Sequence, residues 1–174
     1  MGKPKHGREV YEKAAELLEY NPETGEFKWK VYRGGTCKKG WFAGCVNTQG
    51  YCQIGIYRTL LFAHRLAWYL THGEVPNQID HINGDRSDNS IGNLRSCSNT
   101  QNSRNRTKVQ SNNTSGVSGV SWAKRDSKWL ARIKVDNKYL SLGRFTHLDD
   151  AKQARIEAEK KYFGEFAPQR LTEA

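Results

Sequence analysis

Four polar side chains between residues 80 and 102 form a set that could do chemistry. Asp80 and His81 are adjacent, eleven residues separate His81 from Asn93, and eight separate Asn93 from Asn102. The oxygens of Asp80 and Asn102 suit Mg²⁺ or Mn²⁺ and do not suit zinc. A histidine, with an ordinary pKa of about 6.5, can be neutral and basic at working pH. Such a set fits phosphodiester hydrolysis, which needs a hard divalent ion at the phosphate and a general base for the attacking water.

A particular succession of elements must bring these side chains together. Segments 79–81 and 94–97 read as short strands, with a turn at 83–85 between them. Segment 98–101, Ser-Asn-Thr-Gln, has the spacing of a capping box, which predicts a helix that carries Asn102 in its first turns. The sequence therefore predicts a strand, a loop, a strand and a helix whose polar groups could converge.

The chain before this set is a series of short elements. We expect a helix over 8–19, a turn at 21–25, a strand over 27–31, alternation at Cys52, Ile54 and Ile56, and a helix over 62–70 that ends at Gly73. The following stretch, 77–113, is rich in Asn, Asp, Ser, Arg and Gly. Its plain interpretation is a long solvated loop. However, 37 residues without structure would be unusual in a compact protein, and such stretches are often functional.

The C-terminal third has a regular pattern. Strands are expected over 117–122 and 138–142, and the alternation around Trp129–Val135 predicts a strand between them. Thr146–Asp149 resembles a capping box with Asp in place of Glu. The apolar stripe of the helix that follows is Leu148, Ala151, Ala154, Ala158 and Tyr162, and Gly164 should end it.

Composition narrows the class of partner. The chain has 174 residues, with 28 Lys and Arg against 18 Asp and Glu, which gives a formal net charge of +10. A surplus of this size indicates a polyanionic partner such as nucleic acid. The longest apolar stretch, 59–70, is interrupted by His64 and Arg65 and is far short of a membrane span. No secretory signal follows the basic start, so we expect a cytoplasmic protein, in a bacterial host if a phage encodes it.

The four cysteines do not predict a metal centre. Cys37, Cys45, Cys52 and Cys97 form no C-x-x-C pair, and no histidine lies at a zinc-like distance behind one. A reducing compartment also disfavours a disulfide framework. We therefore expect small buried or semi-buried thiols and no structural zinc.

The central motifs resemble the HNH endonucleases, and the likeness is greatest to the phage-associated, homing-type branch. The motifs are His64-Arg65-Leu66-Ala67-Trp68, Ile79-Asp80-His81-Ile82-Asn83-Gly84-Asp85, Asn93-Leu94-Arg95 and Gln101-Asn102-Ser103-Arg104-Asn105. The resemblance implies a ββα-metal fold in which His81 activates water. It also implies that Asp80 and Asn102 bind one divalent cation and that Asn93 pins the loop and orients His81. His64 and Arg65 match the upstream His-Arg pair, in a supporting or phosphate-contacting role.

The C-terminal part resembles the APETALA-type, ethylene-response-factor DNA-binding domain. The segments that carry this likeness are Gly119–Trp122, Lys128–Ile133, Leu142–Phe145 and Tyr162–Ala167. The resemblance implies a three-stranded sheet that enters the major groove, backed by a helix. Between Ser118 and Thr146 there are seven Lys or Arg against two acids, and alternation leaves Lys128, Arg132 and Lys134 on the open face with Tyr139. The first strand departs from the plant pattern, because it offers Ser118 and Ser121 where several arginines are usual.

These patterns together predict an enzyme with two DNA-binding parts. The residues expected to contact DNA are Arg65, Arg95, Arg104, Arg106, Lys108, Lys124, Arg125, Lys128, Arg132, Lys134 and Tyr139. A DNA-binding regulator with a non-catalytic HNH scaffold is the rival interpretation, although a scaffold would not need all four polar residues. An RNA-binding protein is a third, which would expect more exposed aromatic rings on the C-terminal sheet.

The sequence thus predicts an α+β protein with a ββα-metal (HNH) catalytic module, followed by a small three-stranded antiparallel sheet packed on one helix. The expected parts are an N-terminal tail and helix (1–20), the HNH domain (21–108), a linker (109–115), the DNA-binding domain (116–167) and a tail (168–174). The expected function is that of a Mg²⁺- or Mn²⁺-dependent endonuclease of homing type, which cuts or nicks double-stranded DNA at a preferred site. It requires no protein partner and no membrane, and it leaves room for dimerisation.

Overall fold

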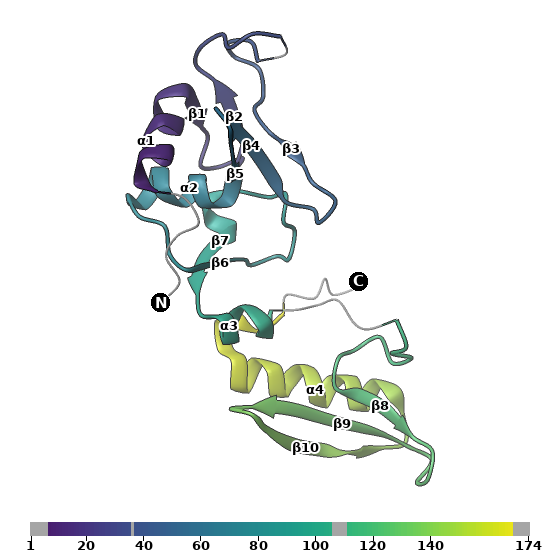
Figure 1. The fold of residues 1–174 in the computed structure, drawn as a ribbon. Coiled ribbons are helices and arrows are strands. Elements are labelled where there is room, and N and C mark those ends of the chain that lie inside the picture. Colours follow the sequence, from purple (N-terminus) through teal and green to yellow (C-terminus); the bar gives the residue numbers. More distant parts are fainter. Residues whose placement is uncertain (1–6, 36, 106–110, 169–174) are drawn as a thin grey trace. The chain divides into compact units, whose positions relative to one another are not determined.

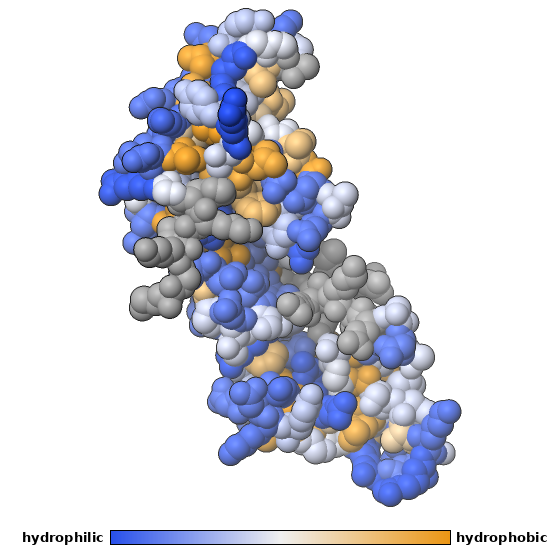
Figure 2. All heavy atoms as spheres, in the orientation of Figure 1, coloured by the Kyte–Doolittle hydropathy of each residue, from blue (hydrophilic) through white to orange (hydrophobic). Residues whose placement is uncertain are grey.

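The computed structural model describes residues 7–35, 37–105 and 111–168, and it mixes helices with small antiparallel sheets (Figure 1). The chain divides into two compact units, Met1–Asn102 and Ser103–Ala174. Figure 2 shows hydrophilic residues over much of the visible face of both units, with apolar residues in smaller groups between them.

Unit 1 contains three small sheets and three helices in its described residues. Its elements are α1 (Arg8–Leu17), β1 (Leu18–Tyr20), β2 (Phe27–Trp29), β3 (Cys45–Val46), β4 (Cys52–Ile56), β5 (Thr59–Phe62), α2 (Ala63–His72), β6 (Gln78–His81), the 3-10 helix η1 (Ile91–Asn93), β7 (Leu94–Cys97) and α3 (Asn99–Arg104). The antiparallel sheets are β1-β2, β3-β4-β5 and β6-β7. The last of α3's residues, Ser103 and Arg104, belong to unit 2.

One apolar cluster holds unit 1 together. Its largest fully buried side chains come from α1, β1, β4, β5 and α2, and they are Tyr11, Leu18, Ile54, Ile56, Leu61 and Leu66. The same cluster reaches Ile79 on β6 and Leu94 on β7. The core therefore fixes the β6–β7 hairpin against the rest of the unit.

The predicted end of α2 is confirmed. Gly73 follows the helix in the left-handed conformation, with φ 77°, and its N–H bonds to the carbonyl of Tyr69. A residue without a Cβ adopts this conformation at little cost, which is why glycine ends so many helices. The helix itself begins at Ala63, one residue later than expected.

Unit 2 is a three-stranded antiparallel sheet with one long helix on it. Its elements are β8 (Val120–Ala123), β9 (Lys128–Val135), β10 (Lys138–Phe145), α4 (Leu148–Phe163) and the 3-10 helix η2 (Gly164–Phe166), and the sheet order is β10-β9-β8. The alternation on β9 is confirmed, because Ala131 and Ile133 are buried and Arg132 and Lys134 are exposed.

Two local predictions in unit 2 are wrong. The N-cap residue of α4 is His147, and no side chain caps the helix, so the Thr146–Asp149 capping box does not form. Tyr162, expected in the apolar stripe, is 37% exposed, and Phe163 is buried instead. Arg155 and Glu159 are also buried on this face and form an ion pair at 3.0 Å. A buried helix face that is predicted from apolar residues alone omits charged residues that are buried because they pair with each other.

Among the described residues, none of the helices combines the length and the hydrophobicity that a membrane span requires. The four cysteines form no disulfides, and Cys37, Cys52 and Cys97 are half-buried, whereas Cys45 is exposed, contrary to expectation.

Candidate active site

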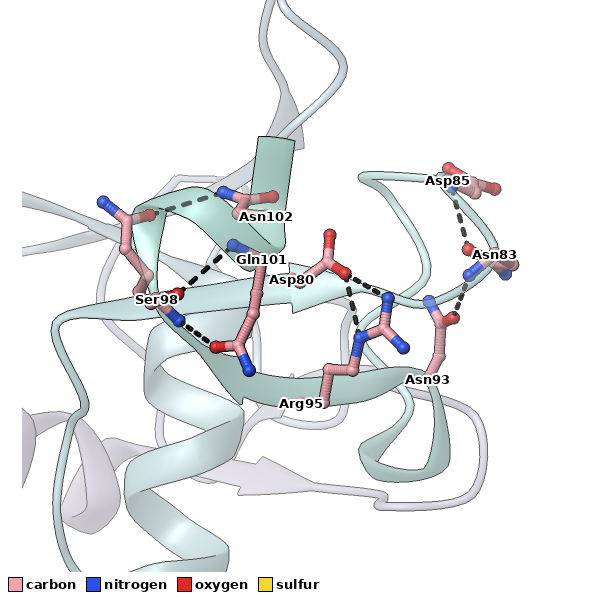
Figure 3. A network of polar contacts seen from close by, with 9 residues as sticks. Asp80, Asn83, Asp85, Asn93, Arg95, Ser98, Gln101 and Asn102 are labelled. Atoms are coloured by element: carbon pink, nitrogen blue, oxygen red, sulfur yellow. Dashed lines mark hydrogen bonds and ion pairs between the residues drawn. The ribbon is translucent and has the colours of Figure 1, made fainter. Parts of the chain in front are cut away.

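The antiparallel pairing of β6 with β7 places the predicted residues in register. Asp80 lies opposite Arg95, and His81 lies opposite Leu94. His81 is the last residue of β6, and Asn93 immediately precedes β7. Figure 3 places Asp80 within the hairpin, Asn93 at its loop end and Asn102 on the helix that follows. Both strands were predicted from the sequence, and in the structure they place their polar residues on one hairpin.

The Asn93 side chain ties down the loop that joins the two strands. Its Oδ1 accepts a hydrogen bond from the Asn83 N–H at 3.0 Å (Figure 3). Its Nδ2 donates to the Asp88 carbonyl at 2.9 Å. The backbone carbonyl of Asn93 also accepts from the Ile82 N–H at 2.9 Å. Asn93 is buried, so these bonds are shielded from water. One amide thus fixes both ends of the turn that follows His81.

The predicted capping box at the start of α3 is confirmed. The Gln101 N–H donates to Ser98 Oγ at 3.2 Å, and the Ser98 N–H donates to Gln101 Oε1 at 2.7 Å. Asn102 follows in the first turn, and its Nδ2 donates to Oε1 of Gln78 on β6 at 3.5 Å. The cap and this contact orient the Asn102 amide relative to the hairpin (Figure 3).

The Asp80 carboxylate forms an ion pair across the hairpin. Nε and Nη2 of Arg95 donate to its Oδ2 at 2.9 and 2.6 Å. The side chains are 7% and 12% exposed, so water screens the pair weakly. Arg95, predicted to contact DNA, therefore neutralises the residue predicted to bind a metal ion.

His81 lies in a small aromatic cluster that sequence reasoning did not assemble. Its ring centroid is 5.1 Å from that of His64 and 6.0 Å from that of Tyr51. Tyr51 also contacts His64, at 5.4 Å between centroids, and the Arg86 guanidinium lies 4.7 Å from the Tyr51 ring. Tyr51 is thirty positions before His81, so only the tertiary fold brings it here. Sequence alone offered no local signal for this contact.

Burial sets the protonation of both histidines. It lowers the pKa of His64 to about 3, with the charges of His81 and Arg65 adding to the effect. Burial also lowers the pKa of His81, against the opposing influence of the Asn89 amide and of the Asp80, Asp88 and Asp85 carboxylates. Both imidazoles are therefore neutral at physiological pH, and a neutral imidazole can accept a proton.

The donor set suits a hard divalent cation. Asp80 offers a carboxylate and Asn102 an amide oxygen, and the Asn102 hydrogen bond to Gln78 uses Nδ2 rather than that oxygen. Within the part of the chain that the structure describes, no three His, Cys, Asp or Glu side chains gather into a metal-binding group. A cation held here would therefore have few protein ligands and would keep positions for water and phosphate.

The other basic residues predicted in the central region have varied surroundings. Arg65 donates to the carbonyls of Pro76 and Asn77, at 3.1 and 3.5 Å, and so braces the loop before β6. In unit 2, Arg104 lies 3.6 Å from the Asp136 carboxylate and 5.2 Å from the Phe163 ring. Arg106 and Lys108 lie outside the described residues.

The open face of the unit 2 sheet carries a basic group around one ring. Tyr139 is 65% exposed, with the Arg132 guanidinium 5.0 Å and the Lys134 amine 5.7 Å from its ring. Lys128 is exposed at the start of β9. Lys124 and Arg125 are exposed in the β8–β9 turn, where Asp126 pairs with Arg125 and with Arg144. The predicted face is present, and Arg144 is a member that sequence reasoning left out.

Comparison with known proteins finds a family match over this hairpin. Residues 61–104, which include α2, the β6–β7 hairpin and α3, match the HNH endonuclease family. The chain is also similar to Protein 3.8 of Escherichia phage T7, with 34% identity over 77 residues. The matched region covers 43% of this chain and 63% of the phage protein, which is less than two thirds of its length. No solved structure matches the chain.

Proposed function

We propose that the protein is a metal-dependent endonuclease that hydrolyses phosphodiester bonds in double-stranded DNA. The observation that carries this proposal is the buried His81 next to Asp80, at the end of a hairpin whose loop Asn93 ties down. This arrangement lies within the segment that matches the HNH endonuclease family. A histidine held neutral next to a carboxylate is suited to general-base work at neutral pH.

In the proposed reaction, His81 takes a proton from the attacking water. Asn93 is a positioning residue, because it fixes the turn that begins directly after His81. His64 and Tyr51 confine the His81 ring from its other sides. The products would carry a 5′ phosphate and a 3′ hydroxyl.

Asp80 and Asn102 would hold one divalent cation, Mg²⁺ or Mn²⁺. When bound, such an ion supplies neutralisation of the charge that develops on the phosphate and on the leaving 3′ oxygen. Arg95 holds the Asp80 carboxylate in place by its two hydrogen bonds.

Unit 2 supplies the second DNA contact in this proposal. Lys128, Arg132, Lys134 and Tyr139 form a basic open face on a three-stranded sheet, as in the APETALA-type domains that this part resembles. A sheet of this kind fits the major groove. We infer a homing-type enzyme with a preferred site, which a phage encodes and which acts in the bacterial cytoplasm.

The decisive experiment compares the wild-type protein with the His81→Ala variant on supercoiled plasmid in the presence of Mg²⁺. Loss of a positioned general base should lower the cleavage rate about 10²–10⁴-fold. Duplex binding should change little, because His81 is buried and contributes no phosphate ligand. His147→Ala is the matched control, since His147 is exposed at the start of α4, in the other unit.

The same experiment separates the enzyme from its rival, a DNA-binding regulator with a non-catalytic HNH scaffold. A regulator would retard the plasmid in a gel without cutting it, with or without Mg²⁺. The enzyme should stop cutting in excess chelator. If His81→Ala cuts at the rate of the His147→Ala control, the role of His81 as base is wrong.

A further inference from the structure

One segment of unit 1 carries basic residues and no acidic ones. From Phe27 to Gly73 the chain has seven Lys or Arg residues and no Asp or Glu. This run covers β2 to α2 and ends before the β6–β7 hairpin of the candidate active site. Its excess charge is therefore additional to the basic face of unit 2, and Arg65 is the only one of its seven basic residues that was predicted above to contact DNA.

Exposed aromatic rings lie among these cations. Trp41 is 52% exposed and Phe42 is 63% exposed, in the segment that pairs with β2 through the bridge between Lys28 and Phe42. The amine of Lys28 lies 5.0 Å from the Phe42 ring, and that of Lys38 lies 5.0 Å from the Trp41 ring. We call Lys28, Lys38, Trp41 and Phe42 the Trp41 patch.

A second ring and cation are connected to the same loop. The Arg33 guanidinium lies 4.9 Å from the Trp29 ring and 5.1 Å from the ring of Tyr57, which is 68% exposed. The Arg33 N–H also bonds to the Cys37 carbonyl, which ties it to the turn that carries Lys38. Near β2 and the loop that follows it, Figure 2 shows strongly hydrophilic residues beside pale and apolar ones.

Rings and cations together select a particular ligand chemistry. Cations alone suffice for contact with the phosphates of a duplex, whose base faces are hidden in the stack. Exposed rings add affinity for a nucleic acid only if that nucleic acid presents the flat faces of its bases, as an unpaired strand does. Glu19 lies opposite Lys28 across β1–β2, and with Lys38 the patch remains net positive. The surface therefore fits a negatively charged strand with free bases better than an intact duplex.

We propose that the Trp41 patch binds an unpaired nucleic acid strand. Trp41 and Phe42 stack on bases, and Lys28 and Lys38 contact the adjoining phosphates. This inference goes beyond the proposed function, because it assigns a second binding site whose occupancy can be measured without cleavage.

The test measures binding of the full-length protein in chelator, so that no strand is cut. The probes are fluorescein-labelled 20-nucleotide dT and U strands and a 20-base-pair duplex, followed by fluorescence anisotropy. Each stacked base is worth roughly fivefold or more in affinity, so Trp41→Ala with Phe42→Ala should weaken single-strand binding at least about tenfold. Duplex affinity should change less than about threefold. The strand that binds more tightly, dT or U, identifies DNA or RNA as the source.

Matched variants distinguish stacking from loss of fold. Tyr162→Ala is the control, because Tyr162 is also exposed with a lysine amine, that of Lys161, 5.4 Å from its ring, but lies on α4 of unit 2. Trp41→Phe keeps a ring that can stack and should retain most of the affinity. Lys28→Gln with Lys38→Gln should lower the slope of log affinity against log salt by roughly 1.4, because each neutralised phosphate of a single strand contributes about 0.7 to that slope.

Three results would overturn the proposal. In the first, the wild-type protein binds neither single strand. In the second, the Trp41→Ala/Phe42→Ala variant binds single strands as tightly as the Tyr162→Ala control does. In the third, the Trp41→Ala/Phe42→Ala variant loses as much affinity for the duplex as for the single strands. None of these depends on whether the protein cuts DNA.

Discussion

His64 and His81 share one aromatic cluster but differ in what surrounds them. His81 has carboxylates nearby that partly oppose the effect of burial on its pKa. For His64, in contrast, the positive charge of Arg65 and that of His81 when protonated lower the pKa further. The Nδ1 atom of His64 is buried and makes no hydrogen bond within the described part of the chain. His64 therefore suits the role of a neutral side chain that packs against His81, and His81 is the histidine that can exchange a proton.

The low pKa of His64 predicts a pH-dependent stability. The unfolded chain binds a proton at this residue below about pH 6.5, whereas the folded protein does so only near pH 3. The contribution of His64 to folding is therefore fully present above pH 6.5 and is lost as the pH falls toward 3. Between pH 7 and pH 5 the loss should be about 2 kcal/mol of unfolding free energy.

Urea unfolding at pH 7, 6 and 5 measures this loss. The His64→Gln variant is the comparison, because its amide does not titrate and because His81 contributes equally to both proteins. The variant should be less sensitive to pH than the wild type by about the same 2 kcal/mol. Equal pH sensitivity in the two proteins would mean that His64 is not held neutral by burial.

At the scale of elements, the capping box of α3 connects local sequence to the site. Ser98 and Gln101 satisfy each other's backbone N–H groups, and the helix that they start carries Asn102. Ser98→Ala removes one of these bonds, which typically costs about 0.5–2 kcal/mol of helix stability. A less fixed Asn102 should raise the Mg²⁺ concentration needed for half-maximal cleavage, by roughly three- to tenfold if about 1 kcal/mol reaches the cation site.

A Mg²⁺ titration of plasmid cleavage measures this effect. Thr100→Ala is the matched control, because Thr100 is exposed in the same helical turn and takes no part in the cap. A Ser98→Ala variant with the Mg²⁺ response of Thr100→Ala would show that the cap does not position Asn102 for a cation.

The elements also show which structural features can be predicted from the sequence. β7, the capping box of α3 and the end of α2 at Gly73 were predicted because strand alternation, caps and glycine stops depend on neighbours within a few residues. The failed α4 cap has the right spacing, but the chain satisfies that helix end without it. Contacts between distant residues have no such local signature. The Arg155–Glu159 pair was not predicted, because only packing against the sheet buries that face of α4. The contact of Tyr51 with His81 connects the loop before β4 to the end of β6, which are far apart in the sequence.

At the scale of the whole molecule, the two units have separate cores. The apolar cluster of unit 1 draws on residues from Tyr11 to Leu94, and the two clusters of unit 2 draw on residues from Val117 to Ala167. Just before β8, the Ser115 hydroxyl is buried and hydrogen-bonded to Val117 and Val120, so this part of the expected linker packs with unit 2. The boundaries of the functional domains remain a prediction, which division of the chain can test.

Division of the chain after Lys108 should yield two folded fragments with different activities. Met1–Lys108 keeps Asp80, His81, Asn93 and Asn102 together with the whole apolar cluster of unit 1, so it should fold and nick DNA. Its affinity should be lower and its footprint shorter, because tethering two weak binders raises the effective concentration of the second. The C-terminal fragment should bind duplex DNA without cutting it.

In the intact protein, Arg132→Ala should reproduce part of this loss of affinity. If Arg132 reads a base, the loss should be about 1–3 kcal/mol, with relaxed sequence preference. If Arg132 contacts a phosphate, binding should weaken uniformly across sequences and depend less steeply on salt. Footprinting and anisotropy on one preferred duplex compare the proteins. If the N-terminal fragment gives the same footprint and affinity as the intact protein, unit 2 does not contact DNA, and the enzyme reads its target through unit 1 alone.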